Sequence, residues 1–336
     1  MSRNQHRIAA SRLAAVVFGA TLVAASAGIA TAAGDTAAAG NATSAGEPTA
    51  IFMPVRGSHG PFGGGGSSPL SYHGGNPGVI TGGNKVYLVY WGSQWNSGDP
   101  SGEAAIQKSF FSGVGGSSWN NSVTQYCIGI TTGTSNCSNA KTFASNPSGV
   151  WAASISDTAS LAPAHPKQSQ LAAEAVNVAT DLLSKNTIGV ADLSHVQFVI
   201  NTASGNNSSG FGTRFCAWHS STSFTYNGSG YTIAYTNMPY ITDAGASCGA
   251  NFNGLGANAG ITIVGGHEFG ETETDIFPSG GWLDGSGAEN GDKCAWISSG
   301  QGAAADTTLS TGTFPVQSLW SNAFNSGTGG CVLSYP

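Results

Sequence analysis

One seven-residue run places the strongest constraint on how this chain can fold. Residues 85–91 read Lys-Val-Tyr-Leu-Val-Tyr-Trp, so large apolar side chains occupy both odd and even positions. A short run of this kind is typical of a strand that is covered on both faces. We therefore expect a central strand over 85–91, inside a sheet that has helices packed against it.

Other segments supply helices and further strands. Residues 167–185 repeat their apolar side chains at helical spacing, which predicts an amphipathic helix. The repeating residues are Leu171, Ala175, Ala179 and Leu182. The other elements that we expect are helices over 103–111 and 260–274 and strands over 196–201 and 231–235. This order predicts an α+β fold, a mixed sheet with packed helices, in a single domain over residues 69–336.

The first 68 residues are interpreted as two segments that precede this domain. Arginines lie ahead of an uncharged stretch rich in Ala and Gly, and Ala30-Thr31-Ala32 has the A-x-A pattern that signal peptidase cleaves. We therefore expect residues 1–32 to be a signal peptide. Residues 33–68, rich in Ala, Gly, Ser and Thr, are expected to be a flexible leader or pro-segment. The mature chain would then be extracellular and not bound to a membrane.

Cysteine usage agrees with secretion. The chain has 6 cysteines, all after residue 32, and disulfides form in oxidising compartments. No C-x-x-C spacing occurs, which disfavours a cysteine metal site. The disulfide pairs that we expect are Cys127–Cys137, Cys216–Cys248 and Cys294–Cys331.

Charge is scarce in this chain and is concentrated in one place. Only 8% of the residues are charged and only 11 are Lys or Arg, which disfavours a nucleic-acid-binding protein, because such a protein needs a basic surface. Seven of the 17 acidic residues lie between 268 and 292, namely Glu268, Glu271, Glu273, Asp275, Asp284, Glu289 and Asp292. Crowded carboxylates repel one another unless a cation neutralises them, and only Lys293 is local. A bound divalent metal explains this cluster most simply.

The acidic stretch begins with a metal-binding pattern, H-E-x-x-E. Residues 267–271 read His-Glu-Phe-Gly-Glu, so His267 and Glu271 would lie one helical turn apart on the same face. This is the ligand spacing of H-E-x-x-H zinc peptidases, with a carboxylate in place of the second histidine. Zn²⁺ accepts both kinds of ligand, and Glu268 would take a proton from a metal-bound water. The motif therefore predicts a zincin-like active-site helix.

The third zinc ligand has to come from elsewhere in the chain. Glu289 follows Glu271 at nearly the separation found for a downstream Glu ligand in one class of zinc peptidases, and Asp275 and Asp292 compete for this role. His219, within Cys216-Ala-Trp-His219, is a further candidate. It would serve as an extra ligand or as a catalytic donor to the transition state, and a purely structural histidine is the alternative.

Two other interpretations of the acidic stretch stay open. Carboxylate and hydroxyl oxygens at short spacing suit Ca²⁺, which a loop would bind through Asp284, Ser286, Glu289 and Asp292. Paired carboxylates also hydrolyse sugars, although that mechanism does not require the His-Glu pair. A Ser-His-Asp hydrolase is disfavoured because the chain has no G-x-S-x-G motif.

Several motifs resemble the phosphate-induced protein 1, or EXORDIUM-like, family. The segment Tyr72-His73-Gly74-Gly75-Asn76-Pro77 resembles the family's Y-H-x-G-P, with an inserted residue before the proline, and it precedes a V-x-L-I-W-Y-G-like strand at 86–92. The segments that are similar to the bacterial branch are Cys216–His219, Asn237–Tyr240, His267–Asp275, Trp282 and Glu289–Cys294. The chain departs from the family in lacking a proline directly after Asp275. The resemblance implies an extracellular protein that faces the cell wall.

We therefore expect a secreted zinc-dependent peptidase that acts on a peptide or protein substrate. His267, Glu271 and one of Glu289, Asp292 or Asp275 would bind Zn²⁺, and Glu268 would activate the water. The alternative is a non-enzymatic extracellular protein that binds cell-wall material and holds a structural Ca²⁺.

Overall fold

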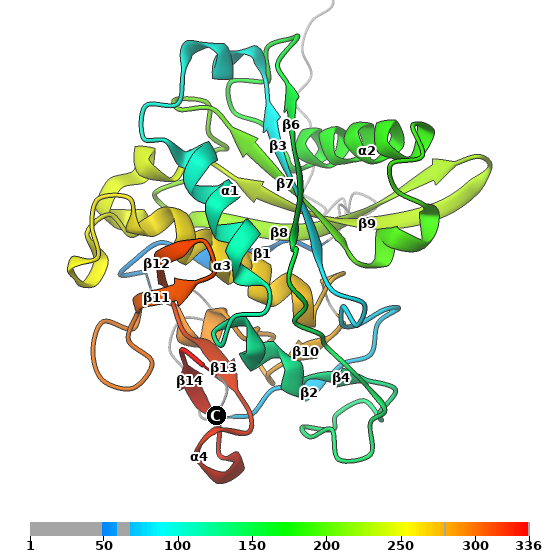
Figure 1. Ribbon diagram of the computed structural model, residues 1–336, viewed down its shortest axis with the longest axis vertical. Helices are drawn as coiled ribbons and strands as arrows, with labels where there is room; N and C mark the ends of the chain where they lie inside the picture. The colour runs from blue at the N-terminus through cyan, green and yellow to red at the C-terminus, as the bar shows by residue number, and fades with distance from the viewer. Residues whose placement is uncertain (1–48, 59–67, 279, 335–336) are drawn as a thin grey trace, which may run out of the picture. The chain divides into compact units, whose positions relative to one another are not determined.

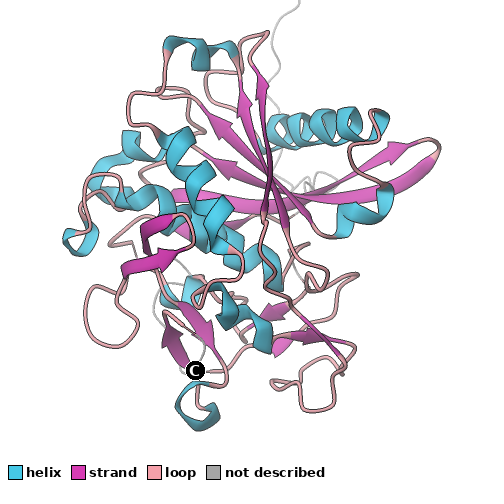
Figure 2. Cartoon of the chain, in the orientation of Figure 1, coloured by secondary structure: helices cyan, strands magenta, loops and turns pink. Residues whose placement is uncertain are grey.

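The computed structural model describes residues 49–58, 68–278 and 280–334. Within this part of the chain, the main feature is a six-stranded sheet with the strand order β1-β8-β9-β7-β3-β6 (Figures 1 and 2). Its strands are β1 (Ile51–Pro54), β3 (Lys85–Trp91), β6 (Trp151–Asp157), β7 (Val196–Thr202), β8 (Phe215–Tyr226) and β9 (Ser229–Met238). Strands β6, β3, β7 and β9 are parallel, whereas β8 pairs antiparallel with β9 and β1. The expected mixed sheet, with an inner strand at 85–91, is confirmed.

Helices cover both faces of this sheet. They are α1 (Glu103–Val114), α2 (Gln168–Ser184) and α3 (Ala259–Thr274), whereas the short α4 (Phe324–Gly327) lies away from it, near the C-terminus (Figure 1). Along β3, Val86 and Leu88 belong to the core that contains α1 and α3, whereas Tyr87 and Val89 belong to the core that contains α2. Figure 1 shows α2 apart from α1 and α3, on the other side of the sheet. This alternation explains why the sequence of β3 is apolar at every position.

The three expected helices and the expected strands are present, with shifted ends. Helix α1 continues beyond 111 to Val114, and β9 extends the 231–235 strand in both directions. Strand β8, twelve residues long, was not expected. A tight turn at residues 210–214 precedes this strand. The strand forms a hairpin with β9, and its first residues are buried.

An N-terminal strand lies inside the segment interpreted as a leader. Strand β1 pairs with β8 at the edge of the sheet, and Ile51 is opposite His219. Met53 is fully buried, and Val55 packs into the same core. Ordered structure therefore begins before the expected start near residue 69. Residues 1–48, which include the expected signal peptide, and residues 59–67 lie outside the described residues.

Smaller two-stranded sheets and three disulfides complete the described structure. The strand pairs are β2 (Ser71–Tyr72) with β10 (Trp282–Leu283), β4 (Cys127–Ile128) with β5 (Thr142–Phe143), β11 (Ala305–Leu309) with β12 (Gly312–Val316), and β13 (Leu319–Ser321) with β14 (Gly330–Val332). The disulfides Cys127–Cys137, Cys216–Cys248 and Cys294–Cys331 confirm the expected pairing. Among the described residues, no helix has the length and apolar character needed to cross a membrane.

Candidate metal centre

Helix α3 carries the H-E-x-x-E motif through the interior of the protein. All of its residues are buried, and its apolar side chains are distributed around the whole helix, as is typical of a helix enclosed by protein. Glycine at position 270 permits close packing, because a Cβ atom there would lie 2.9 Å from Leu319 Cδ1 and would have to displace that side chain. The motif side chains consequently face other protein groups, and His267, Glu268 and Glu271 are exposed by no more than 1%.

Three segments that are distant in sequence meet at this motif. Strand β8 contributes His219, which is 1% exposed, and the segment before and within the short 3₁₀ helix η6 (Asp292–Cys294) contributes Glu289 and Asp292. Disulfides anchor both incoming segments, because Cys216 lies in β8 and Cys294 ends η6. The structure thus brings together most of the residues that the sequence analysis selected.

His267 faces two carboxylates through one ring nitrogen. Its Nε2 atom lies 3.0 Å from Glu271 Oε1 and 3.8 Å from Asp292 Oδ1. Glu271 Oε1 also accepts a hydrogen bond from the Asp292 backbone N–H at 2.8 Å. The expected pairing of His267 with Glu271 across one helical turn is therefore present, and Asp292 joins it.

Gln317 orients the His267 ring from the opposite side. The Gln317 amide nitrogen donates to the Gly291 carbonyl at 2.9 Å, so its Oε1 atom is left to face His267 Nδ1 at 3.2 Å. Because this oxygen only accepts, Nδ1 carries the proton and donates. When a metal displaces the proton on Nε2, this contact would leave the Nε2 lone pair directed at the ion, which is the arrangement that outer partners impose on metal-binding histidines.

His219 lies among three carboxylates. Its Nδ1 atom is 3.2 Å from Glu268 Oε2 and 3.5 Å from Glu271 Oε2, and its Nε2 atom is 3.4 Å from Glu289 Oε2. Strand β8 directs this side chain toward α3, and the strand pairing with β1 and β9 fixes its position. His219 is therefore part of the cluster and is not an isolated structural histidine.

Two groups of side chains in the described chain have the geometry to hold a metal ion. One group is His219, Glu268 and Glu271, and the other is His267, Glu271 and Asp292. In each group the ligand atoms lie within 4.8 Å of one another. Glu271 belongs to both groups, so the two groups form one continuous centre.

Several polar atoms of this centre have no hydrogen-bond partner although they are buried. They include Glu268 Oε1, Glu271 Oε2, Glu289 Oε1 and Asp292 Oδ1. Buried carboxylate oxygens are normally paired, because leaving them unpaired forfeits their hydration without replacement. The unpartnered oxygens therefore indicate that a positive group belongs among them.

The pKa values of these side chains reflect the same crowding. Burial raises the pKa of Glu289 and Asp292, and the Glu271 carboxylate adds to this, so both pKa values lie well above the usual range. Burial lowers the pKa of His267, but Glu271, Glu268 and Asp292 outweigh burial and raise it to about 10. The metal-free centre thus retains protons, and a bound cation would displace them.

Lys293, the cation nearest to the acidic stretch in sequence, pairs with Asp284, a carboxylate outside both metal-capable groups. Its Nζ atom lies 2.9 Å from Asp284 Oδ2 and 4.3 Å from the centre of the Trp320 ring. Asp284 also accepts hydrogen bonds from the Ser286 and Ala288 backbone N–H groups, so Ser286, Ala288 and Lys293 use the oxygens of Asp284. Asp284 belongs to neither metal-capable group, so these groups do not join it to Asp292 as the calcium loop would require.

Asp275, the remaining candidate ligand, lies beside the two groups and belongs to neither. Its backbone N–H donates to the Glu271 carbonyl and ends α3, and its side chain is buried. It is close enough to contribute to the raised pKa of Glu289, after burial and Glu271. Its position therefore favours an electrostatic effect on the centre over direct ligation.

Sequence reasoning missed two residues that shape the centre. Gln317 lies between β12 and β13, far from the motif in sequence, and nothing in its local sequence signals a role. Gly291 lies beside Asp292, and a Cβ atom there would lie 2.8 Å from Glu271 Oε1. A glycine directly before an acidic residue of the cluster was the one available signal for this contact.

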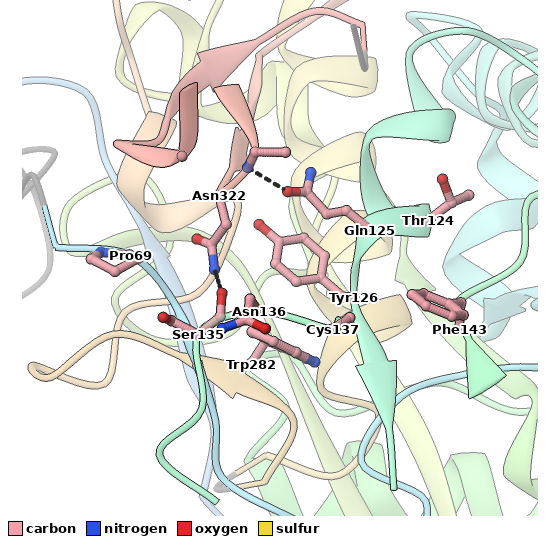
Figure 3. A pocket seen from close by; sticks show the side chains of 12 residues that line it. Pro69, Thr124, Gln125, Tyr126, Ser135, Asn136, Cys137, Phe143, Trp282 and Asn322 are labelled. Atoms are coloured by element: carbon pink, nitrogen blue, oxygen red, sulfur yellow. Dashed lines mark hydrogen bonds between the residues drawn. The ribbon is translucent and has the colours of Figure 1, made fainter. Parts of the chain in front are cut away.

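A surface hollow lies away from the metal-capable groups. It has a volume of 520 Å³ and is lined by Tyr126, Trp282 and Asn322 among others (Figure 3). Hydrogen bonds from Asn322 to the Ser135 carbonyl and from Ala323 N–H to Gln125 cross its wall. None of its lining residues belongs to the metal-capable groups, so a molecule bound there would not contact the centre.

The chain matches no protein-family model, no curated protein and no solved structure. The function of the centre has to be inferred from its own geometry.

Proposed function

We propose that this chain is a secreted metalloprotein that binds Zn²⁺ between α3, β8 and residues 289–292. The observation that carries the proposal is the convergence of two histidines and four carboxylates at no more than 1% exposure, with oxygens left unpaired. Removing an ionised carboxylate from water costs several kcal/mol unless the carboxylate is paired with a positive group. A divalent cation would compensate this cost and would join three separate segments of the fold.

Zinc is favoured over calcium because both metal-capable groups contain an imidazole nitrogen. Zn²⁺ accepts nitrogen and carboxylate oxygen together, whereas Ca²⁺ prefers sets made only of oxygen ligands. The Gln317 contact supports the same choice, since it holds His267 with Nε2 directed at the carboxylates.

Metal analysis of the purified protein tests this proposal. Protein secreted into zinc-replete medium, and then passed through a weak chelating resin, should retain zinc when measured by inductively coupled plasma mass spectrometry. A His219→Ala, His267→Ala double variant should retain none. Wild-type protein without any bound metal would overturn the proposal.

A second candidate function, zinc-dependent hydrolysis of peptide bonds, is favoured by Glu268. This carboxylate lies on α3 between two expected ligands, and its Oε1 atom is unpartnered. Bound zinc lowers the pKa of a coordinated water. Glu268 would accept the proton and pass it to the leaving amine, and His219, 3.2 Å from Glu268, would orient it. The 1% exposure of Glu268 ranks this candidate second, because a substrate has to reach the same position.

Glu268→Gln separates a catalytic base from a metal ligand. If Glu268 is the base, the Glu268→Gln variant should keep zinc and lose hydrolysis of an unfolded protein substrate such as casein. If Glu268 is a metal ligand, the variant should bind zinc more weakly. Glu273→Gln is the matched control, since Glu273 is a buried carboxyl of the same helix, lies outside both groups and accepts from Asn120 at 3.3 Å. Hydrolysis that persists in zinc-loaded Glu268→Gln would exclude the peptidase candidate.

Membership of the EXORDIUM-like family, with cell-wall material as a partner, is part of this proposal and rests on the motif residues alone. The motif histidines and acids at 219, 267–271 and 289–292 meet in one centre, which supports their having a common role. Retention of the secreted protein on isolated cell walls, compared with its retention after metal removal, would test the wall-facing role.

A further inference from the structure

The two oxygens of Glu271 face different histidines. Oε1 lies 3.0 Å from His267 Nε2, and Oε2 lies 3.5 Å from His219 Nδ1. A carboxylate that binds one metal ion through both oxygens turns them toward one point, and one that binds through a single oxygen leaves the other for a hydrogen bond. Glu271 is instead positioned between two sets of ligands, and its Oε2 atom has no hydrogen-bond partner despite complete burial.

Each side of Glu271 has its own complete set of donors. On one side, His219 Nδ1 and Glu268 complete a group with Glu271, and Glu289 Oε2 lies 3.4 Å from the other ring nitrogen of His219, Nε2. On the other side, His267 and Asp292 complete a group with the same carboxylate. Each group also has an unpartnered oxygen of its own, Glu268 Oε1 in the first and Asp292 Oδ1 in the second.

Charge balance favours more than one divalent cation once all four carboxylates are ionised. Glu268, Glu271, Glu289 and Asp292 together bring four negative charges into a region from which water is excluded, and the imidazoles are neutral when they ligate a metal. One divalent ion would leave two charges without compensation, whereas two ions would balance all four. Lys293 pairs with Asp284, which lies outside both groups.

We propose that the centre holds two divalent cations and that Glu271 bridges them, one oxygen to each. This inference rests on the proposed metal-binding function and extends it from one ion to a two-metal cluster of the kind found in hydrolases and phosphate-processing enzymes. His219 Nδ1 and Glu268 bind the first ion, and His267 and Asp292 bind the second, while Glu289 pairs with His219 Nε2. Glu268 is then a ligand, so the two-cation centre and the peptidase scheme with Glu268 as base are mutually exclusive.

Zinc stoichiometry decides between the possible outcomes. Metal-depleted full-length protein is dialysed against Zn²⁺ at a free concentration set by a buffering chelator, and zinc and protein are then measured separately. We expect a plateau at two zinc ions per chain. A plateau at one ion would overturn the two-cation inference and leave the proposed metal-binding function standing. A plateau at zero would overturn both.

Single-histidine variants assign the two positions. His219→Ala and His267→Ala should each bind at most one zinc ion, and His165→Ala, which removes an exposed histidine outside the centre, should still bind two. A folded His219→Ala or His267→Ala protein that binds two ions would overturn the assignment. Because these variants can fail to fold, Co²⁺-loaded wild-type protein gives a second readout. Two bridged Co²⁺ ions should couple magnetically and give a weaker electron paramagnetic resonance signal per cobalt than one isolated ion, and an uncoupled signal at full loading would contradict the bridge.

Discussion

At the residue scale, Gly291 contributes no side chain to the centre and yet determines how closely its ligands approach. A Cβ atom at this position would lie 2.8 Å from Glu271 Oε1 and 2.9 Å from His267 Nδ1. The φ angle of Gly291 is −77°, which any residue adopts, so the requirement for glycine arises from space alone.

Gly291→Ala should therefore weaken metal binding without removing a ligand. The added methyl group has to displace Glu271 or His267, and displacing the groups that support a metal site commonly lowers affinity by about tenfold or more. Gly285→Ala is the matched control in the same loop, because nothing lies within 4 Å of its Cβ position. Zinc affinity measured by chelator competition should fall only in Gly291→Ala, and equal affinities in the two variants would show that the contact is unimportant.

A second residue-scale prediction concerns the buried Lys293–Asp284 pair. Asp284→Asn should reduce the free energy of unfolding by about 3 kcal/mol, because it leaves a buried ammonium without its carboxylate. Asp181→Asn, in the exposed Lys185–Asp181 pair, should change it by less than about 0.5 kcal/mol. Urea unfolding near pH 7 measures both, and equal losses would contradict the role of burial.

The same pair predicts a pH dependence with a definite sign. Burial raises the pKa of Asp284, but hydrogen bonds from Ser286 and Lys293 outweigh burial and lower the pKa to about 2 from an ordinary 3.8. A lowered carboxyl pKa stabilises the fold above the unfolded value, and this stabilisation disappears as the pH falls through the folded value. The difference in stability between wild type and Asp284→Asn should thus shrink between about pH 4 and pH 2. A constant difference would mean that Asp284 does not titrate in this range.

At the scale of elements, local sequence predicted helices better than edge strands. The α3 motif could be found because ligand spacing on one helix is a local property. The edge strand β1 could not, because it pairs with β8, a segment more than 160 residues away, as in the register of Ile51 with His219. The orientation of His219 toward α3 depends on that pairing, which explains why its role as ligand or structural residue stayed open.

Strand β1 should be part of the folded unit rather than a dispensable leader. Met53→Ala should lower the free energy of unfolding by about 3 kcal/mol, because Met53 is fully buried and its truncation leaves a cavity. Phe52→Ala is the control on the same strand, since 43% of Phe52 is exposed and its side chain points to the opposite face. Comparable losses of stability in thermal unfolding would argue against a core role for β1.

At the scale of the whole molecule, the two metal-capable groups connect segments that only the tertiary fold brings together. The sequence concentrated seven acids between 268 and 292, and this concentration correctly indicated where the centre lies. The acidic pattern did not distinguish the residues of the centre from nearby acids. Asp284 and Glu273 are acidic like Glu289 and Asp292, but the fold gives them hydrogen-bond partners elsewhere. Lys293 and Asn120 are such partners, and neither contact is encoded by spacing along the chain.

Because the unfolded chain does not hold these segments together, metal binding should stabilise the folded protein in proportion to the number of ions. Above the dissociation constant, each tenfold rise in free zinc raises the free energy of unfolding by about 1.4 kcal/mol per bound ion. Two ions should thus give a slope of about 2.7 kcal/mol per tenfold change. Urea unfolding with disulfides intact, in buffers of fixed free zinc, measures this slope. A slope of about 1.4 kcal/mol per tenfold change in free zinc would match a centre with one ion. A free energy of unfolding that does not change with zinc would show that the folded chain binds zinc no better than the unfolded chain.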